Sequence, residues 1–191
     1  RASFEVARLR KGKIVSVDKS NVVVTGALWR EVVGRIGSDE YPDVKLQHFF
    51  ADNAIYQLGL NPTAFDVIMA DNLFGDLISD QAGIIAGSLG VLPSACLPGI
   101  PKPGESIGPG IYEPVHGSAP DIAGRGIANP IGMILSVAMM LEFGLGHGQL
   151  AQKIHAAVAL SFESGTLTPD LGGGATTKEV TDLVISNYRG L

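Results

Sequence analysis

The 191-residue sequence has one cysteine, one tryptophan and only 17% charged residues. A single cysteine, Cys96, excludes an internal disulfide and a Cys-rich zinc site. It is typical of a reducing compartment, so we expect a cytoplasmic protein. Fourteen Lys and Arg stand against nineteen Asp and Glu, and the only basic run covers residues 8–13. We therefore expect neither nucleic acid nor an anionic membrane surface as a partner.

Long hydrophobic runs are also missing. The longest apolar helix candidate, residues 131–145, contains Glu142 and is too short to cross a bilayer. No leader pattern opens the sequence, and residues 1–10 have the spacing of a helix whose beginning is absent. Hydrophobic residues nevertheless make up 46% of the chain, which is enough for a sizeable core in one or two domains.

Apolar spacing predicts alternating strands and helices, and therefore an α/β protein with a largely parallel sheet. We expect strands at residues 13–17, 44–49, 65–69 and 110–115, and helices at residues 26–36, 52–60, 72–89, 150–164 and 177–188. One more helix should begin at Asn129 and Pro130 and end near Gly144. Residues 93–110 hold five prolines and several glycines, so we expect an irregular, exposed excursion there.

The most informative segment is Asp71-Asn-Leu-Phe-Gly-Asp76-Leu-Ile-Ser-Asp80. It follows a short apolar strand, so Asp76 and Asp80 would lie on one face of the first turns of a helix. Two carboxylates at this spacing suit a hard divalent cation such as Mg²⁺ or Mn²⁺. The alternative is that Asp76 only stabilises the helix start and Asp80 is merely solvated.

Four blocks of sequence, in this order, resemble those of the β-decarboxylating dehydrogenases, the family of isopropylmalate, isocitrate, homoisocitrate and tartrate dehydrogenases. They are Ser16-Val-Asp-Lys-Ser-Asn-Val22, Phe50-Ala-Asp-Asn-Ala-Ile-Tyr-Gln-Leu58, the Asp71–Asp80 segment, and Gly110-Ile-Tyr-Glu-Pro-Val-His-Gly-Ser-Ala-Pro-Asp121 with its continuation to Asn129. The resemblance covers nearly the whole chain. Phe74 and the Asp121-Ile122 pair are most similar to the isopropylmalate-specific branch.

The resemblance implies a two-domain isopropylmalate dehydrogenase-like fold, of which this chain is the C-terminal half. Residues 1–88 would belong to the substrate, metal and dimerisation domain, and residues 89–191 to the nucleotide-binding domain. It also implies a homodimer that needs the missing N-terminal half. Helices 52–60 and 75–89 would pair with their counterparts in the second subunit.

The resemblance further implies the site residues. Asp76 and Asp80 of one subunit would share Mg²⁺ or Mn²⁺ with Asp52 of the neighbour, and Lys19 would accept a proton from the C2 hydroxyl across the dimer. Asn21 would contact substrate or nicotinamide, and Val22 would line an alkyl pocket. Without the resemblance, Lys19 would be interpreted as a solvated surface lysine and Asp52 as an acid that stabilises a helix start.

The resemblance also implies an NAD site. The lining positions are Glu113, His116, Gly117, Ser118, Ala119, Asp121, Ile122 and Asn129. Asp121 would accept hydrogen bonds from the adenosine ribose, and its charge would repel the 2′-phosphate of NADP. Asn129 has the alternative role of a helix cap.

The expected activity is NAD-dependent oxidative decarboxylation of 3-isopropylmalate, a small 2-hydroxy acid, in leucine biosynthesis. The alternatives are a tartrate, isocitrate or homoisocitrate dehydrogenase, and a catalytically silent partner subunit. We expect this chain alone to be inactive, because no Tyr or Arg in it matches the family's proton donor or its carboxylate-binding arginines.

Overall fold

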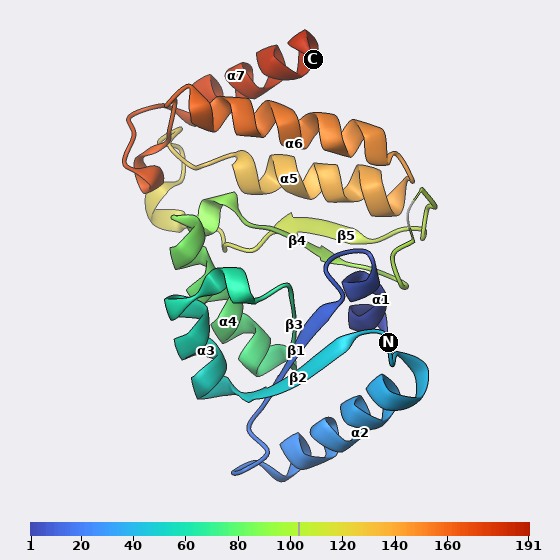
Figure 1. Ribbon diagram of the computed structural model, residues 1–191. Helices are drawn as coiled ribbons and strands as arrows, with labels where there is room; N and C mark the ends of the chain where they lie inside the picture. Colours follow the sequence, from blue (N-terminus) through green and yellow to red (C-terminus); the bar gives the residue numbers. More distant parts are fainter. Residues whose placement is uncertain (103) are drawn as a thin grey trace. The chain divides into compact units, whose positions relative to one another are not determined.

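The computed structural model describes residues 1–102 and 104–191, which form two compact units, Arg1–Ile85 and Ala86–Leu191 (Figure 1). The first unit contains α1 (Ala2–Arg8), β1 (Lys13–Asp18), α2 (Val24–Glu40), β2 (Lys45–Phe50), α3 (Ala51–Leu60), a 3₁₀ turn (Pro62–Ala64), β3 (Val67–Met69) and α4 (Asn72–Ala86). The expected order of elements is confirmed, with ends shifted by a few residues. The largest shift is at α2, which is longer at both ends.

The sheet of the first unit is parallel, in the order β2-β1-β3, so β1 is the central strand. Successive side chains of a strand point to opposite faces. Ile14 accordingly packs with Phe4 of α1 and Val33 of α2. Val15 and Val17 pack on the other face against α3 and α4. Both faces of β1 are covered, which is why five of its six residues are buried.

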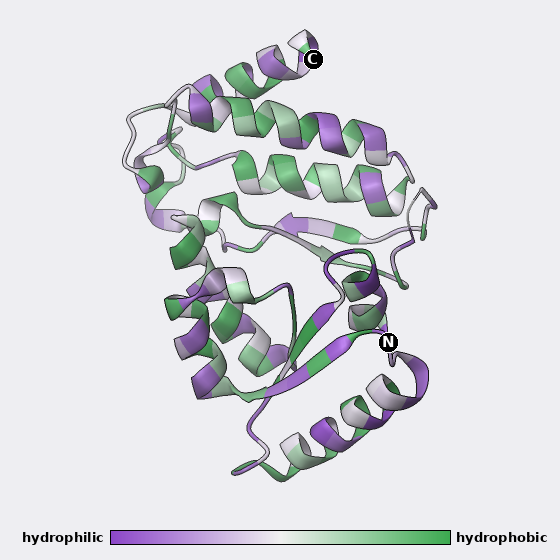
Figure 2. Cartoon of the chain, viewed as in Figure 1, coloured by the Kyte–Doolittle hydropathy of each residue, from purple (hydrophilic) through white to green (hydrophobic). Residues whose placement is uncertain are grey.

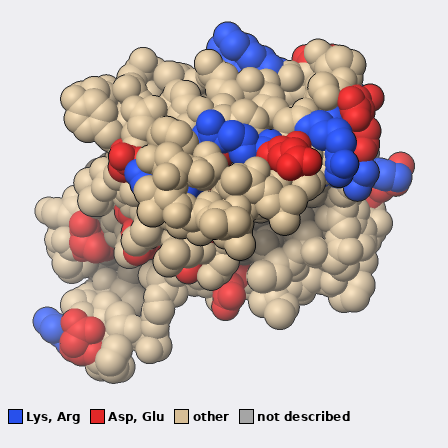
Figure 3. Space-filling model, turned by 90° about the horizontal axis from the view of Figure 1, so that it is seen from below, with Lys and Arg blue, Asp and Glu red and all other residues tan. Residues whose placement is uncertain are grey.

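Several charged side chains on this unit form ion pairs. Arg1 binds Glu40 at 2.6 Å, and Arg8 binds Asp43 at 2.5 Å. On the face of the molecule drawn in Figure 3, Lys and Arg lie beside Asp and Glu, and most of the surface is uncharged. Positive charge on that face is therefore mixed with negative charge.

The second unit is layered. It contains a 3₁₀ turn (Leu89–Val91), β4 (Pro93–Cys96), β5 (Ile111–Pro114), a 3₁₀ turn (Pro120–Ile122), α5 (Ile131–Met139), a π-helical turn (Met140–Gly144), α6 (Gly148–Glu163), a 3₁₀ turn (Pro169–Leu171) and α7 (Thr177–Gly190). Helix α5 packs on the two strands, α6 packs on α5, and α7 packs on α6 (Figure 1). Figure 2 shows α5 as mainly hydrophobic, as expected for a helix that lies between the strands and α6, whereas α7 carries both hydrophobic and hydrophilic residues.

The expectation that residues 93–110 would be irregular throughout is wrong at their first residues. Pro93–Cys96 is strand β4, and it pairs antiparallel with β5, so the sheets are not all parallel. The physical reason is that proline is tolerated as the first residue of a strand, especially at an edge, and a two-stranded sheet consists of edges. Pro103, from the same expected excursion, lies outside the described residues.

Among the described residues, no helix is long and apolar enough to span a membrane.

Gly173 gives a prediction about stability. A Cβ at this position would overlap the carbonyl oxygen of Leu167, whereas a Cβ at the neighbouring Gly174 would meet nothing within 4 Å. We expect Gly173→Ala to lower the free energy of unfolding by about 2–4 kcal/mol, because backbone must move to relieve the overlap. Gly174→Ala, the matched control, should change it by less than about 0.5–1 kcal/mol. Urea unfolding followed by circular dichroism measures both, and equal losses would contradict the packing at Leu167.

Candidate functional site

Lys19 and Asp52 form an ion pair in the first unit. Lys19 directly follows the last residue of β1, and Asp52 is the second residue of α3, which directly follows β2. Because β1 and β2 are parallel neighbours, their carboxyl ends lie side by side. Lys19 Nζ donates a hydrogen bond to Asp52 Oδ1 at 2.6 Å. Two predicted site residues that are 33 positions apart in the sequence are therefore in contact.

The pair differs in exposure. The Lys19 side chain is 26% exposed and that of Asp52 is 72% exposed, so the carboxylate remains accessible from solvent. The hydrogen bond from Lys19 lowers the pKa of Asp52 below its ordinary value, against a smaller opposing effect of burial. Asp52 is therefore ionised at neutral pH and can serve as an oxygen ligand for a cation.

Asn21 and Val22 lie in the turn after β1. The backbone N–H groups of Val22 and Val23 both donate to the carbonyl oxygen of Lys19, at 2.9 and 2.8 Å. Asn21 is exposed and Val22 is 71% exposed, so both side chains lie at the surface of this chain, next to Lys19 in sequence.

Asp76 and Asp80 are one turn apart near the start of α4, and both are exposed. Among the described residues, neither side chain makes a hydrogen bond or an ion pair. Nor does the described part of the chain contain a group of three or more His, Cys, Asp or Glu side chains that could hold a metal ion. Two unpaired carboxylates on one face fit a hard cation.

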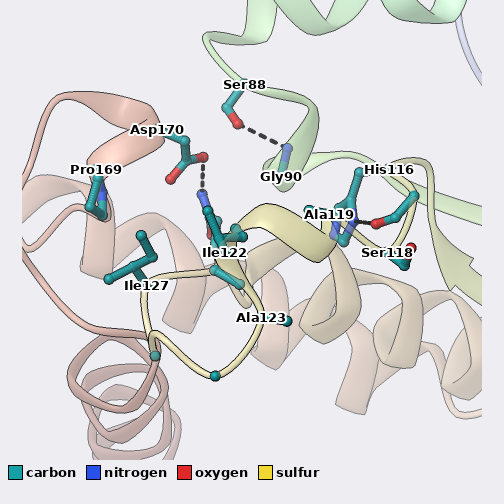
Figure 4. Close-up of a pocket in the computed structure, with 15 residues that line it drawn as sticks. Ser88, Gly90, His116, Ser118, Ala119, Ile122, Ala123, Ile127, Pro169 and Asp170 are labelled. Carbon is teal, nitrogen blue, oxygen red and sulfur yellow. Dashed lines mark hydrogen bonds between the residues drawn. The ribbon is translucent and has the colours of Figure 1, made fainter.

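The second unit contains a cavity of about 750 Å³, drawn in Figure 4. This volume lies within the usual range for small-molecule sites. The lining residues are Ser88, Gly90, His116, Gly117, Ser118, Ala119, Ile122, Ala123, Gly124, Gly126, Ile127, Ala128, Asn129, Pro169 and Asp170. In the view of Figure 4, Pro169 and Asp170 lie at one side and His116 and Ser118 at the other.

Six of the eight predicted cofactor residues line this cavity: His116, Gly117, Ser118, Ala119, Ile122 and Asn129. Asp121 is exposed on the 3₁₀ turn Pro120–Ile122, beside Ile122, and is not a lining residue. Glu113 is exposed on β5 and is not a lining residue either. The loop is shaped by residues with positive φ, which include Ala119 at 42°, Gly124 at 76° and Gly126 at 66°.

Sequence reasoning missed the polar side of the cavity. Asp170 Oδ2 accepts a hydrogen bond from Asn129 Nδ2 at 3.0 Å, while Asn129 Oδ1 accepts one from the N–H of Ile131 at 3.0 Å. The N-cap of α5 is Pro130 rather than the expected Asn129, but Asn129 still accepts from the first N–H of the helix and also lines the cavity. Burial raises the pKa of Asp170, but hydrogen bonds from Ser88, Thr168 and Asn129 outweigh this effect, so its pKa lies below the ordinary value.

Gly90 explains how these groups approach one another. A Cβ there would lie 2.8 Å from Asn129 Cβ and 3.0 Å from Asp170 Oδ2. A glycine in the segment Ser88-Leu-Gly-Val was the one local signal available, since glycine permits close approach of a backbone. Nothing near Asp170 in the sequence indicates its contact with Asn129, which is 41 residues away.

The model of the isocitrate/isopropylmalate dehydrogenase family matches residues 1–184. The chain belongs to this family. Its relatives include the 3-isopropylmalate dehydrogenases of Caulobacter vibrioides, 49% identical over 97% of this chain and 51% of that protein, and of Zymomonas mobilis, 51% identical over the same shares. The chain thus spans about half the length of the curated relatives that it matches.

Solved structures agree with this assignment. The isocitrate dehydrogenase of Methylococcus capsulatus matches with a TM-score of 0.87 at 34% identity, over 98% of this chain and 54% of that one. A β-decarboxylating dehydrogenase from Thermococcus kodakarensis matches with a TM-score of 0.81 at 38% identity, over 98% of this chain and 53% of that one. The predicted family and its α/β fold are confirmed.

Proposed function

We propose that this chain corresponds to the C-terminal half of an enzyme that oxidatively decarboxylates 3-isopropylmalate with NAD⁺, a step of leucine biosynthesis in the cytoplasm. The observation that carries the proposal is the 2.6 Å contact between Lys19 and Asp52 at the ends of adjacent parallel strands. The names of relatives about 50% identical to this chain support the choice of substrate.

The first unit would supply the reacting groups. Neutral Lys19 would accept the proton that leaves the C2 hydroxyl, and Asp52 would accept a hydrogen bond from the ammonium group that results. Asp76 and Asp80 of one subunit would hold Mg²⁺ or Mn²⁺ together with Asp52 of the second subunit of a homodimer, which would also supply Lys19. Asn21 and Val22 would contact the substrate beside Lys19. We propose that residues 1–88 form part of this substrate, metal and dimerisation domain.

The second unit, proposed as the part of the nucleotide-binding domain in residues 89–191, would hold NAD. The backbone of Gly117, Ser118 and Ala119 would approach the cofactor closely, and Ile122 would pack on its adenosine. Asp121 and Glu113, which do not line the cavity, would contact the cofactor from beside it. When bound, NAD⁺ would supply a hydride acceptor and the divalent cation a Lewis acid for oxidation and decarboxylation of the substrate.

Activity should depend on completing the chain. We expect no NADH formation from the chain alone, because the groups that bind the substrate carboxylates lie outside it. Coexpression with the N-terminal half of the Zymomonas mobilis relative should give a complex of both halves, the completed enzyme. It should oxidise 3-isopropylmalate in preference to isocitrate and tartrate. Preference for isocitrate would support a second candidate function, isocitrate dehydrogenase, which the match to a solved isocitrate dehydrogenase suggests. Activity with none of the three acids would overturn the proposal.

Metal binding gives a separate prediction. In the completed enzyme, Asp76→Asn and Asp80→Asn should each weaken Mn²⁺ binding at least about tenfold, because each removes one of few charged ligands. Electron paramagnetic resonance of free Mn²⁺ measures this directly. Glu31→Gln, an exposed acid on α2, is the matched control and should leave binding unchanged. Wild-type affinity in both aspartate variants would exclude α4 as the metal site.

A further inference from the structure

The carboxylate of Asp18 lies directly before Lys19 and is almost inaccessible, with a relative exposure of 2%. It accepts hydrogen bonds from Nε and Nη2 of Arg30, at 2.8 and 3.1 Å, and from the backbone N–H of Ser20 at 2.9 Å. A bidentate pair of this kind fixes orientation as well as distance. The turn that carries Lys19 is therefore held by α2, the helix on which Arg30 lies.

Arg30 also contacts the segment that carries Asp52. Its guanidinium carbon lies 4.9 Å from the centroid of the Phe50 ring, and Lys19 Nζ lies 5.7 Å from the same centroid. Both cations are within the distance at which the face of an aromatic ring attracts positive charge, about 6 Å. Phe50 ends β2 and caps α3, two residues before Asp52.

These contacts connect five residues in a closed series. Lys19 follows Asp18 in the sequence, and Asp18 is paired with Arg30. Arg30 lies over the aromatic ring of Phe50, which is two residues before Asp52. The Lys19–Asp52 hydrogen bond completes it. A lysine side chain has many rotamers, so an isolated ion pair at this exposure would hold the ammonium group only loosely.

We propose that Arg30 is a positioning residue that fixes the Lys19 turn against the start of α3, so that Lys19 and Asp52 are presented together as a preformed pair. This rests on the proposed function, in which both act on one substrate. Arg30 acts through Lys19 and Phe50, since its own guanidinium is occupied by Asp18 and the ring. A purely structural role, the neutralisation of buried Asp18, would instead affect stability alone.

A spectroscopic test separates the two roles. The test uses nuclear magnetic resonance of the completed enzyme labelled with ¹³Cε-lysine. The Phe50 ring should shift the Lys19 Hε resonance away from the position of a solvent-exposed lysine. The Lys19 signal is identified by its loss in Lys19→Met. Trp29, the only tryptophan of this chain, donates its indole N–H to Ser16 Oγ at 2.9 Å. Its N–H signal, identified by its loss in Trp29→Phe, therefore reports whether α2 stays docked. Arg30→Lys keeps the charge but removes the bidentate fork. In Arg30→Lys, the chemical shift of Lys19 Hε should move to that of exposed Lys45, while the Trp29 N–H signal is retained.

Arg35→Met, an exposed position on the same helix, should change neither signal. Arg30→Met should repeat the result of Arg30→Lys; if it fails to fold, Arg30→Lys decides. An unchanged Lys19 signal in Arg30→Lys overturns the proposal, and so does loss of the Trp29 signal in both variants, because Arg30 would then only stabilise the fold.

Kinetics tests the consequence. Arg30→Lys should lower kcat about 10- to 100-fold and change KM less than about threefold, because misplaced reacting groups slow the chemical step more than binding. A wild-type completed enzyme without activity on any of the three acids would overturn the proposed function, while the Lys19 signal would still decide the role of Arg30. An active wild type with unchanged kcat in Arg30→Lys would overturn only the positioning role.

Discussion

Replacing Lys19 by Met in the completed enzyme is expected to lower kcat by about 10²- to 10⁴-fold, the usual contribution of a positioned acid or base. Methionine retains the unbranched apolar stem but can neither hold a proton nor donate to Asp52. KM for 3-isopropylmalate should change much less, because the proposed carboxylate-binding groups lie outside this chain. Steady-state NADH formation at saturating substrate measures the effect.

Two further observations make this prediction specific. Lys45→Met, at an exposed position on β2, is the control and should retain wild-type kcat. The pKa of Asp52 should rise toward its ordinary value in Lys19→Met, since the hydrogen bond from Lys19 is the main cause of its lowering. If kcat is retained while the Asp52 pKa rises, Lys19 is only the partner of a carboxylate and not the base.

Reversal of charge at Asp121 should change the preferred cofactor. In the unmodified completed enzyme, a 2′-phosphate near this carboxylate should cost on the order of a few kcal/mol, so NAD should bind at least about 100-fold more tightly than NADP. Asp121→Lys combined with Ile122→Tyr should move the preference toward NADP by removing the repulsion and adding a cation. Isothermal titration calorimetry with each cofactor measures this ratio.

The control for the cofactor prediction is Glu163→Lys, which makes the same charge change at the end of α6. It should leave the ratio of the two dissociation constants near its wild-type value. Equal binding of NAD and NADP by the unmodified enzyme would contradict the role proposed for Asp121, and so would a double variant that still prefers NAD.

Much of the fold could be predicted because the signals are local. The short, mainly apolar segment at residues 13–17 predicts β1, and the structure has a strand there that is buried on both faces. Asn129 and Pro130 indicate the start of α5 within one residue. Strand β4 was missed because its first residue is a proline, and its pairing with β5 depends on a segment more than ten residues later.

The candidate sites could likewise be predicted only in part from the sequence. Each block of the sequence indicates its own chemistry, but the contacts between blocks arise only in the fold. Ser88 and Asn129 converge on Asp170 from distant parts of the second unit's sequence, without a shared motif. The Arg30–Asp18 pair likewise joins a helix to a strand end, and a lone arginine in an amphipathic helix carries no sign of it.

The loop around the cavity depends on the last helix of the chain. The backbone N–H of Thr177, at the start of α7, donates to the carbonyl oxygen of Gly126 at 2.8 Å, and the Thr177 hydroxyl donates to Ala128. Thr176 and Glu179 form a capping box that holds this helix start in place. During synthesis, a ribosome adding about 5–20 residues per second makes Thr177 roughly 3–10 s after Gly126. The cavity loop therefore reaches its final form only after the start of α7 has been synthesised.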